Sequence, residues 1–151
     1  MVNKTPTIAL SGAFDPLHVG HVRMIKSAVN FGRVIIILNS DKWVEKKKGY
    51  LLTPWQDRKE LLLSINGVSE VIKVDDSDDT VCEALERMRP TIFGNGGYRT
   101  RNNTPERELC LKLDIRLVWG LGGGEKDAYS NDLMKKILNK GIEEPELEWV
   151  S

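Results

Sequence analysis

The chain has 151 residues and a formal charge of zero, because its 22 basic residues balance its 22 acidic ones. This length predicts one domain that can bury a substantial core. The balanced charge gives no reason to expect a nucleic acid or a membrane as partner, so we expect a small-molecule substrate.

The first predicted motif spans residues 10–21, with the sequence LSGAFDPLHVGH, between a short apolar run and an amphipathic run. This order predicts a strand, a glycine-containing turn and a helix start. Gly12 and Gly20 would let a ligand approach the backbone, and the N–H groups of a helix start attract anions. His18 and His21, the only two histidines, are three positions apart and would point the same way. A phosphate chain would fit such a site.

Two other interpretations of the histidine pair are open. The histidines could be a metal pair, with Asp15 as the only near candidate for a further ligand, or a helix-start pair that backbone groups satisfy. The glycines could simply shape a turn. A metal site needs a third and a fourth ligand, and no further His or nearby Cys is available, so phosphate binding is favoured.

The pattern Gly-x-Phe-Asp-x-x-His-x-Gly-His within residues 12–21 resembles the signature of the HxGH nucleotidyltransferases, the cytidylyltransferase-like group. The resemblance covers nearly the whole chain up to the last predicted helix. Heptose-phosphate adenylyltransferases are the most similar group, and glycerol-3-phosphate cytidylyltransferases are less similar. The resemblance implies that His18 and His21 are catalytic and that a nucleotide binds at Gly12, Ala13, Phe14, Asp15 and Gly20.

The β-branched run Val34–Leu38 predicts a central parallel strand that is covered on both faces. Asn39 and Asp41 follow at its carboxyl end, where doubly wound sheets bind ligands. They are therefore candidates for substrate binding, and ordinary turn chemistry is an equal alternative.

A basic loop is predicted at residues 45–49, EKKKG. A lysine triplet is usually a solvated face, but this position would also let it fold over a polyphosphate. In the sugar-phosphate members of the resembled family a Lys-Gly pair matches Lys48 and Gly49. Lys48 is therefore the first catalytic candidate and Lys46 the second.

A helix is predicted to begin at residues 53–56, with Thr53 as N-cap, and to end at Gly67. Leu61 and Leu62 are expected to face the core. Arg58 is a surface arginine in one interpretation and a nucleotide-binding residue in the other. Function is favoured, because the resembled family carries an arginine here and a planar guanidinium suits phosphate.

Residues 68–74 predict the third strand, and the acidic run at 75–79 is expected to cap the next helix rather than to bind a cation. Residues 91–93 predict the fourth strand. The loop that follows resembles the segment that cradles the nucleobase in the family, and a plain flexible loop is the alternative. Its residues are Gly94, Asn95, Gly96 and Gly97.

A further helix from Thr104 and a fifth strand at 115–119 precede a glycine-rich loop and a last helix. Family members hold the nucleotide phosphates with a Ser/Thr-rich segment at this place. Ser130 matches one of its hydroxyls, whereas Asn131 replaces the next one.

Five apolar runs that alternate with helical ones predict an α/β fold, a Rossmann-like doubly wound five-stranded parallel sheet in a single domain. The nucleotidyltransferase domain is expected to span residues 1–140, with an acidic tail at 141–151. Cys82 and Cys110 lie in apolar, helical runs, which favours reduced thiols. We find no signal peptide and no apolar run long enough to span a bilayer, so we expect a cytoplasmic protein.

The resemblance implies transfer of a nucleoside monophosphate from a triphosphate, ATP or CTP, to a sugar phosphate or polyol phosphate, with release of pyrophosphate. Mg²⁺ is expected to accompany the triphosphate. We expect a homodimer. A catalytically silent nucleotide-binding sensor is the first alternative, suggested by the altered segment at 129–132, and a metal-dependent hydrolase that uses His18, His21 and Asp15 is the second.

Overall fold

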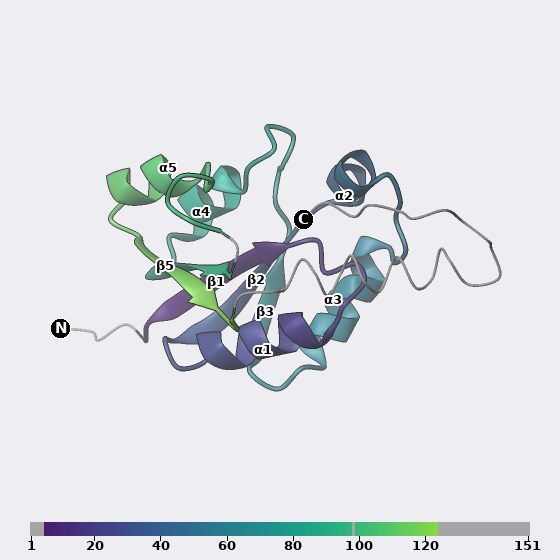
Figure 1. The fold of residues 1–151 in the computed structure, drawn as a ribbon, viewed down its shortest axis with the longest axis horizontal. Helices are drawn as coiled ribbons and strands as arrows, with labels where there is room; N and C mark the ends of the chain where they lie inside the picture. The colour runs from purple at the N-terminus through teal and green to yellow at the C-terminus, as the bar shows by residue number, and fades with distance from the viewer. Residues whose placement is uncertain (1–4, 98, 124–151) are drawn as a thin grey trace.

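The structure is a computed structural model and describes residues 5–97 and 99–123. Its five strands form one parallel sheet in the order β3-β2-β1-β4-β5 (Figure 1). The sheet is wound outward in both directions from β1, so the predicted doubly wound five-stranded parallel sheet is confirmed. The elements in chain order are β1 (Thr7–Gly12), α1 (Val19–Ala28), β2 (Arg33–Leu38), α2 (Asp41–Lys48), α3 (Trp55–Leu63), β3 (Val68–Ile72), α4 (Cys82–Met88), β4 (Ile92–Gly96), α5 (Arg107–Lys112) and β5 (Arg116–Leu121).

Helices cover both faces of the sheet, which explains the apolar runs of its central strands. Successive residues of β1 point to opposite faces, so Ile8 and Leu10 join one core and Ala9 the other. The first core also takes side chains from α1 and α3, and the second takes side chains from α4 and α5. Figure 1 shows α1 and α3 on one side of the sheet and α4 and α5 on the other. The carboxyl ends of β1 and β4 therefore lie side by side at the point where the winding reverses.

The predicted basic loop is wrong, because residues 41–48 form helix α2. Ser40 caps its start by accepting a hydrogen bond from the Trp43 amide, and Gly49 ends it with φ at 80°. The three lysines occupy the last turn, where positive charge is favoured by the helix dipole. The caps at Ser40 and Gly49 stabilise this helix. The charge of the lysine triplet led instead to the prediction of a loop.

The predicted start and end of the next helix are also wrong. Helix α3 begins at Trp55 with Pro54 as N-cap, and Pro54 makes no side-chain capping bond. It ends at Leu63, before Gly67. Leu62 is fully buried as predicted, but the neighbouring Leu61 is 48% exposed, because successive residues of a helix point about 100° apart.

The acidic run does not cap α4. The N-cap of α4 is Val81, which makes no side-chain capping bond. Asp76, in contrast, is buried and accepts hydrogen bonds from Asn39 Nδ2, from the Ser40 amide and from Ser40 Oγ. Its carboxylate thus joins this loop to the end of β2.

Residues 94–96 continue β4 and are not the predicted loop. A Cβ atom on Gly94 would lie 2.6 Å from Leu121 Cδ1 and 2.8 Å from Leu10 Cδ2, so any larger residue would force these buried side chains of the two neighbouring strands to shift. The first glycine of this segment thus has a role in packing within the sheet.

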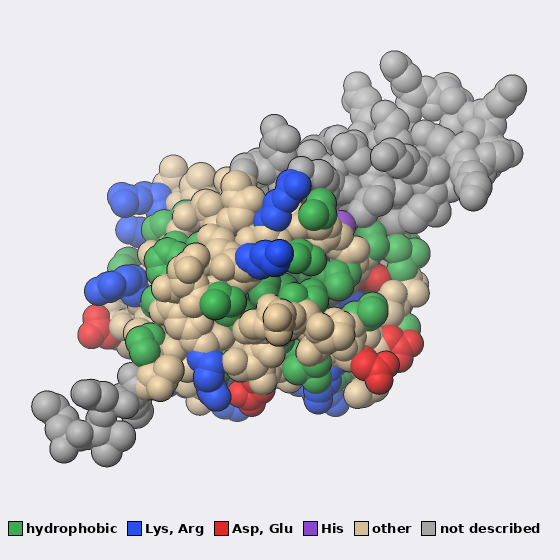
Figure 2. All heavy atoms as spheres, turned by 90° about the horizontal axis from the view of Figure 1, so that it is seen from below, with side chains coloured by type: hydrophobic (Ala, Val, Ile, Leu, Met, Phe, Trp, Pro, Cys, Tyr) green, Lys and Arg blue, Asp and Glu red, His purple; other side chains and the backbone are tan. Residues whose placement is uncertain are grey.

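On the face that carries α1 and α3, Figure 2 shows hydrophobic side chains scattered among lysines and arginines. The large exposed ones in this region include Val29, Phe31 and Leu63. Within the described part of the chain, no helix is both long enough and apolar enough to cross a membrane.

Candidate active site

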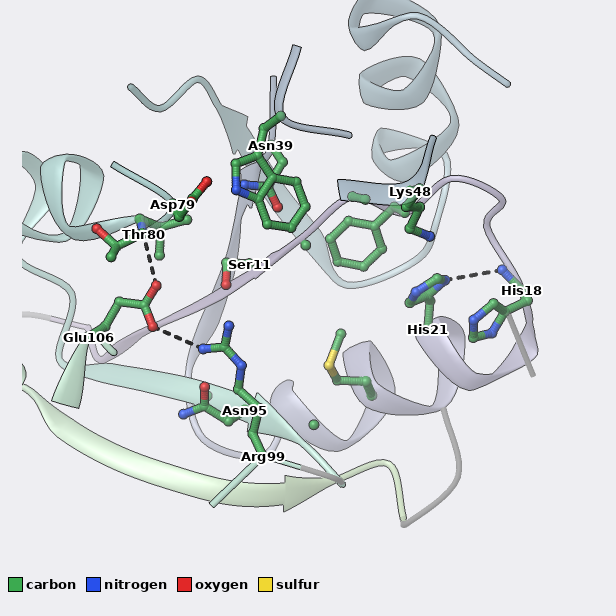
Figure 3. A pocket seen from close by; sticks show the side chains of 18 residues that line it. Ser11, His18, His21, Asn39, Lys48, Asp79, Thr80, Asn95, Arg99 and Glu106 are labelled. Carbon is green, nitrogen blue, oxygen red and sulfur yellow. Dashed lines mark hydrogen bonds and ion pairs between the residues drawn. The ribbon is translucent and has the colours of Figure 1, made fainter. Parts of the chain in front are cut away.

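A cavity opens at the carboxyl ends of β1 and β4, where the sheet topology predicts ligand binding (Figure 3). It brings together most of the residues that the sequence singled out from segments far apart in the chain. Those that line it are Gly12, Ala13, Phe14, His18, His21, Asn39, Lys48, Gly94, Asn95 and Gly96.

The two histidines form a capping box at the start of α1. His18 Nδ1 accepts a hydrogen bond from the Gly20 amide at 3.0 Å, and His21 Nδ1 accepts one from the His18 amide at 3.2 Å. A neutral imidazole whose Nδ1 accepts must carry its proton on Nε2. Each ring is therefore fixed as an Nε2–H donor by the backbone that it caps.

The two imidazole rings are stacked, with centroids 3.8 Å apart and an interplanar angle of 23°. Phe14 packs against His21, with ring centroids 4.7 Å apart, and itself has the left-handed φ of 50°. A Cβ on Gly12 would lie 3.0 Å from the Phe14 ring, so the glycine makes room for that ring. The loop after β1 thus holds both imidazoles as one rigid pair.

Asp15 is fully buried beneath this loop and does not line the cavity. Its Oδ2 accepts the Leu52 amide at 2.8 Å, and its carbonyl oxygen accepts Lys48 Nζ at 3.0 Å. Its other carboxylate oxygen is buried and has no hydrogen-bond partner among the described residues. Asp15 therefore fastens the loop to the segment after α2, and nucleotide binding by Asp15 stays a prediction.

The structure separates the two candidate lysines. Lys48 lines the cavity, whereas Lys46 does not and has a side chain that is 65% exposed. Lys46 and Lys47 lie 3.4 Å and 3.5 Å from the Asp79 carboxylate. Desolvation of the Asp79 carboxylate acts to raise its pKa. The two lysine charges and their hydrogen bonds outweigh this effect, so the pKa of Asp79 lies below its ordinary value.

Arg58 is 1% exposed, so its interpretation as a surface arginine is wrong. Its Nη1 donates to the carbonyls of Ala13 at 2.8 Å and Asn39 at 3.0 Å, and its Nε donates to that of Thr53 at 2.8 Å. Its Nη2 pairs with Asp41 Oδ1 at 2.6 Å. Arg58 and Asp41 thus support the loop after β1 and the end of β2 from outside the cavity lining. Direct contact of either residue with a ligand stays a prediction.

Sequence reasoning missed a polar wall at one side of the cavity. Glu106 is 1% exposed, and its carboxylate accepts Arg99 Nη1 at 2.9 Å and the Val81 amide at 3.0 Å. Thr80 and Trp43 line the cavity as well. A glutamate near a helix start is ordinarily explained by the helix dipole, so no sequence signal marked Glu106 as buried. The other missed lining residues are Ser11, Met24, Val81 and Asp79.

Besides Asp15, Asp41, Lys46 and Arg58, three predicted residues are not placed in the cavity lining, and one of them is Gly20, whose amide donates to His18 Nδ1. Gly97 follows β4 without lining the cavity, and Ser130 lies outside the described residues. Within residues 5–97 and 99–123, no three His, Cys, Asp or Glu side chains are grouped so that they could hold a metal ion. The trio of His18, His21 and Asp15 that the hydrolase alternative requires is therefore not assembled.

A protein-family model matches most of the chain. The model described as cytidylyltransferase-like covers residues 9–119, from β1 to β5.

Curated relatives include the bifunctional protein HldE of Geobacter sulfurreducens, which is 32% identical over 139 residues. That match covers 89% of this chain and 27% of the relative. The FAD synthase of Pyrococcus abyssi is 31% identical over 96 residues, which cover 62% of this chain and 64% of that enzyme. The chain thus spans about a quarter of the first relative and less than two thirds of the second.

A solved structure shares the fold. The lipopolysaccharide core biosynthesis protein from Thermoplasma volcanium superposes with a TM-score of 0.64 at 20% identity, over 77% of this chain and 96% of that one. A second structure, a protein of unknown function from Archaeoglobus fulgidus, superposes with a TM-score of 0.56 at 21% identity, over 77% and 90% of the two chains.

Proposed function

Because this chain belongs to the cytidylyltransferase-like family, we propose that it transfers a nucleoside monophosphate from ATP or CTP to a sugar phosphate or polyol phosphate and releases pyrophosphate. The observation that carries the proposal is the pair of imidazoles, each fixed as an Nε2–H donor, in the same cavity as Lys48. Such fixed donors stabilise negative charge that develops on phosphoryl oxygens.

In the proposed reaction a phosphate oxygen of the acceptor attacks the α-phosphorus of the triphosphate. The bond from the α-phosphorus to the bridging oxygen breaks, and pyrophosphate leaves with that electron pair. The attacking oxygen is already anionic, so no protein base is needed. His18 and His21 donate hydrogen bonds to the phosphoryl oxygens, and Lys48 compensates charge, with Lys46 as the second choice.

The remaining predicted residues are assigned roles by their positions in the chain. We propose that the loop after β1 and the end of β4 bind the nucleotide, and that Asn39 and Asp41 contribute to the acceptor side. Arg58 would act on the nucleotide by holding Ala13 and Asn39 in place. The nucleotide residues are Gly12, Ala13, Phe14, Asp15, Gly20, Arg58, Gly94, Asn95, Gly96, Gly97 and Ser130.

Mg²⁺ would enter with the triphosphate. Proteins usually bind Mg²⁺ through one or two carboxylates together with substrate phosphates, and the cavity offers the carboxylate of Asp79. The metal would supply charge compensation on the phosphates. We expect EDTA to stop pyrophosphate release and added Mg²⁺ to restore it.

The test is pyrophosphate release from ATP, CTP, GTP and UTP, each with heptose 1-phosphate and glycerol 3-phosphate as acceptors. We expect release with ATP or CTP only when a phosphorylated acceptor is present. A thermal shift with nucleotide but no product from any pair would contradict transfer and support the sensor. Triphosphate consumption without acceptor, together with a bound transition metal by elemental analysis, would support the hydrolase.

We also propose a homodimer in the cytoplasm. Light scattering should give twice the 17.1 kDa mass of one chain, and a value of one chain mass would contradict the dimer.

A further inference from the structure

One side of the cavity has a polar wall that the proposed phosphate chemistry does not use. Figure 3 shows Arg99, Glu106 and Thr80 on one side of the cavity and His18 and His21 on the other. Together with Trp43, these three polar residues line the same cavity as the histidines. A ligand that is held by its phosphate at the histidines would extend toward this wall.

The wall is built around an ion pair whose carboxylate is buried. The side chain of Glu106 is 2% exposed, and that of Arg99 is 27% exposed. Glu106, the N-cap of α5, accepts Arg99 Nη1 with one carboxylate oxygen and the Val81 amide at the start of α4 with the other. The carboxylate that holds the guanidinium is therefore itself bonded to the start of α4. Burying such a carboxylate is favourable only when it is paired and hydrogen-bonded, as it is here.

The wall has hydrogen-bond donors that the protein leaves unused. Among the described residues, the Arg99 side chain donates only through Nη1, so its Nε–H and Nη2–H groups have no protein partner. The indole Nε1 of Trp43 is buried and likewise has no partner in the described part of the chain. A buried donor without a partner is unfavourable, so a ligand oxygen that accepts from Trp43 Nε1 would recover that cost.

The charge of the wall decides which oxygens suit it. Glu106 already compensates the charge of Arg99, and Asp79 on the cavity rim is compensated by Lys46 and Lys47. The wall therefore offers donors without net positive charge, which suits neutral hydroxyl groups better than a second phosphate. Glu106 also keeps free lone pairs that can accept from a hydroxyl.

We propose that Arg99 and Trp43 bind the hydroxyl groups of the acceptor, and that Glu106 is a positioning residue that holds Arg99 and cancels its charge. The acceptor is thus selected as a phosphate with several hydroxyls. This inference rests on the proposed function only in that the acceptor phosphate lies at the histidine side.

Calorimetric binding tests the proposal without turnover. Wild-type protein should bind heptose 1-phosphate or glycerol 3-phosphate at least about tenfold more tightly than methyl phosphate, which has the phosphate but no hydroxyl. Arg99→Ala should remove this preference and leave the affinity for methyl phosphate unchanged. Arg33→Ala, at an exposed arginine that starts β2, is the matched control and should behave as wild type.

Three results would overturn the proposal: no preference in the wild type for either hydroxylated phosphate, equal weakening of all three phosphates by Arg99→Ala, or weakening of ATP or CTP binding instead. Failure of the wild type to release pyrophosphate would reject the proposed transfer, yet this binding comparison would stand on its own.

Two further variants separate recognition from folding. Trp43→Phe should weaken binding of the hydroxylated phosphates about three- to tenfold, whereas Trp119→Phe, whose Nε1 donates to Thr104 Oγ1, should not. Glu106→Gln removes the negative charge that compensates Arg99. Methyl phosphate should therefore bind to this variant severalfold more tightly than to the wild type, whereas heptose 1-phosphate should bind more weakly. A glutamate with only a structural role would lower thermal stability and leave the preference unchanged, which would contradict its positioning role.

Discussion

At the scale of single residues, each histidine combines a structural and a proposed chemical role. One ring nitrogen of His18 and of His21 caps the first turn of α1, and the other nitrogen of each ring carries the proton. One interpretation of the histidine pair is that backbone groups satisfy the hydrogen bonds of the two rings. This interpretation is correct for the Nδ1 atoms, and it is compatible with phosphate binding at the Nε2 atoms. The two roles can be separated by substitutions that keep the cap.

Replacing His18 with Ala should lower the free energy of unfolding by about 0.5–2 kcal/mol through loss of the cap. It should also lower turnover by about 10²–10³, because a donor to the phosphoryl oxygens is removed. His18→Asn should restore the stability but not the turnover, since Asn is a good N-cap without an Nε2–H. Denaturant unfolding and pyrophosphate release measure the two effects.

His21→Gln is the matched variant for the second position, because Gln can complete a capping box from the third residue of the helix. A stable His18→Asn or His21→Gln protein with near-normal pyrophosphate release would remove that histidine from catalysis.

The thiols give a second prediction at this scale. Burial, with the nearby charges of Glu106 and the Cys82 thiolate, raises the pKa of Cys110 to about 12, and burial also raises the pKa of Cys82. At pH 8 the thiolate fraction of Cys110 should be about three orders of magnitude below that of a free cysteine. Native protein should therefore label slowly at Cys110 with a thiol reagent, and guanidinium should make labelling fast. Rapid labelling of native Cys110 at pH 8 would contradict the burial.

At the scale of elements, the cavity depends on how the chain is tied together behind the sheet edge. Arg58 on α3 bonds to the loop after β1, to the end of β2 and to Asp41 on α2. Asp76 bonds to Asn39 and Ser40 from the loop before α4. These contacts explain why the cavity residues from separate elements converge.

Arg58→Ala should lower the free energy of unfolding by about 3–5 kcal/mol, because it leaves buried carbonyls and Asp41 without their donor. Arg87→Ala is the control: Arg87 pairs with Glu83 on the surface of α4, and its side chain is 51% exposed. Its loss should cost less than about 1 kcal/mol. Equal denaturation midpoints for the two variants would show that Arg58 is not a support.

At the scale of the whole molecule, a ligand that binds the folded cavity must stabilise the entire fold. ATP or CTP with Mg²⁺ at 100 times its dissociation constant should add about 2.7 kcal/mol. For a domain of this size that corresponds to a rise in Tm of roughly 5–10 °C. Differential scanning fluorimetry measures it, and His21→Gln should reduce the shift at the same nucleotide concentration. An unchanged wild-type Tm with all four triphosphates would argue against nucleotide binding.

The sequence by itself determined the fold class and the centre of the site. Apolar runs such as Val34–Leu38 predict buried parallel strands, and the spacing of His18 and His21 after a glycine turn predicts the helix start. These features depend on residues that are close in the chain, so local chemistry specifies them. The position of Asn39 at a strand end was predictable for the same reason.

Only the tertiary structure decided the other residues of the cavity and their partners. It brought Lys48 rather than Lys46 to the lining, buried Arg58 under the loop, and paired Arg99 with Glu106 beside Trp43. Burial and pairing between residues far apart in sequence depend on how helices pack across the sheet. A lysine triplet or a glutamate near a helix start has the same local pattern whether it faces water or a ligand, so the sequence leaves that choice to the fold.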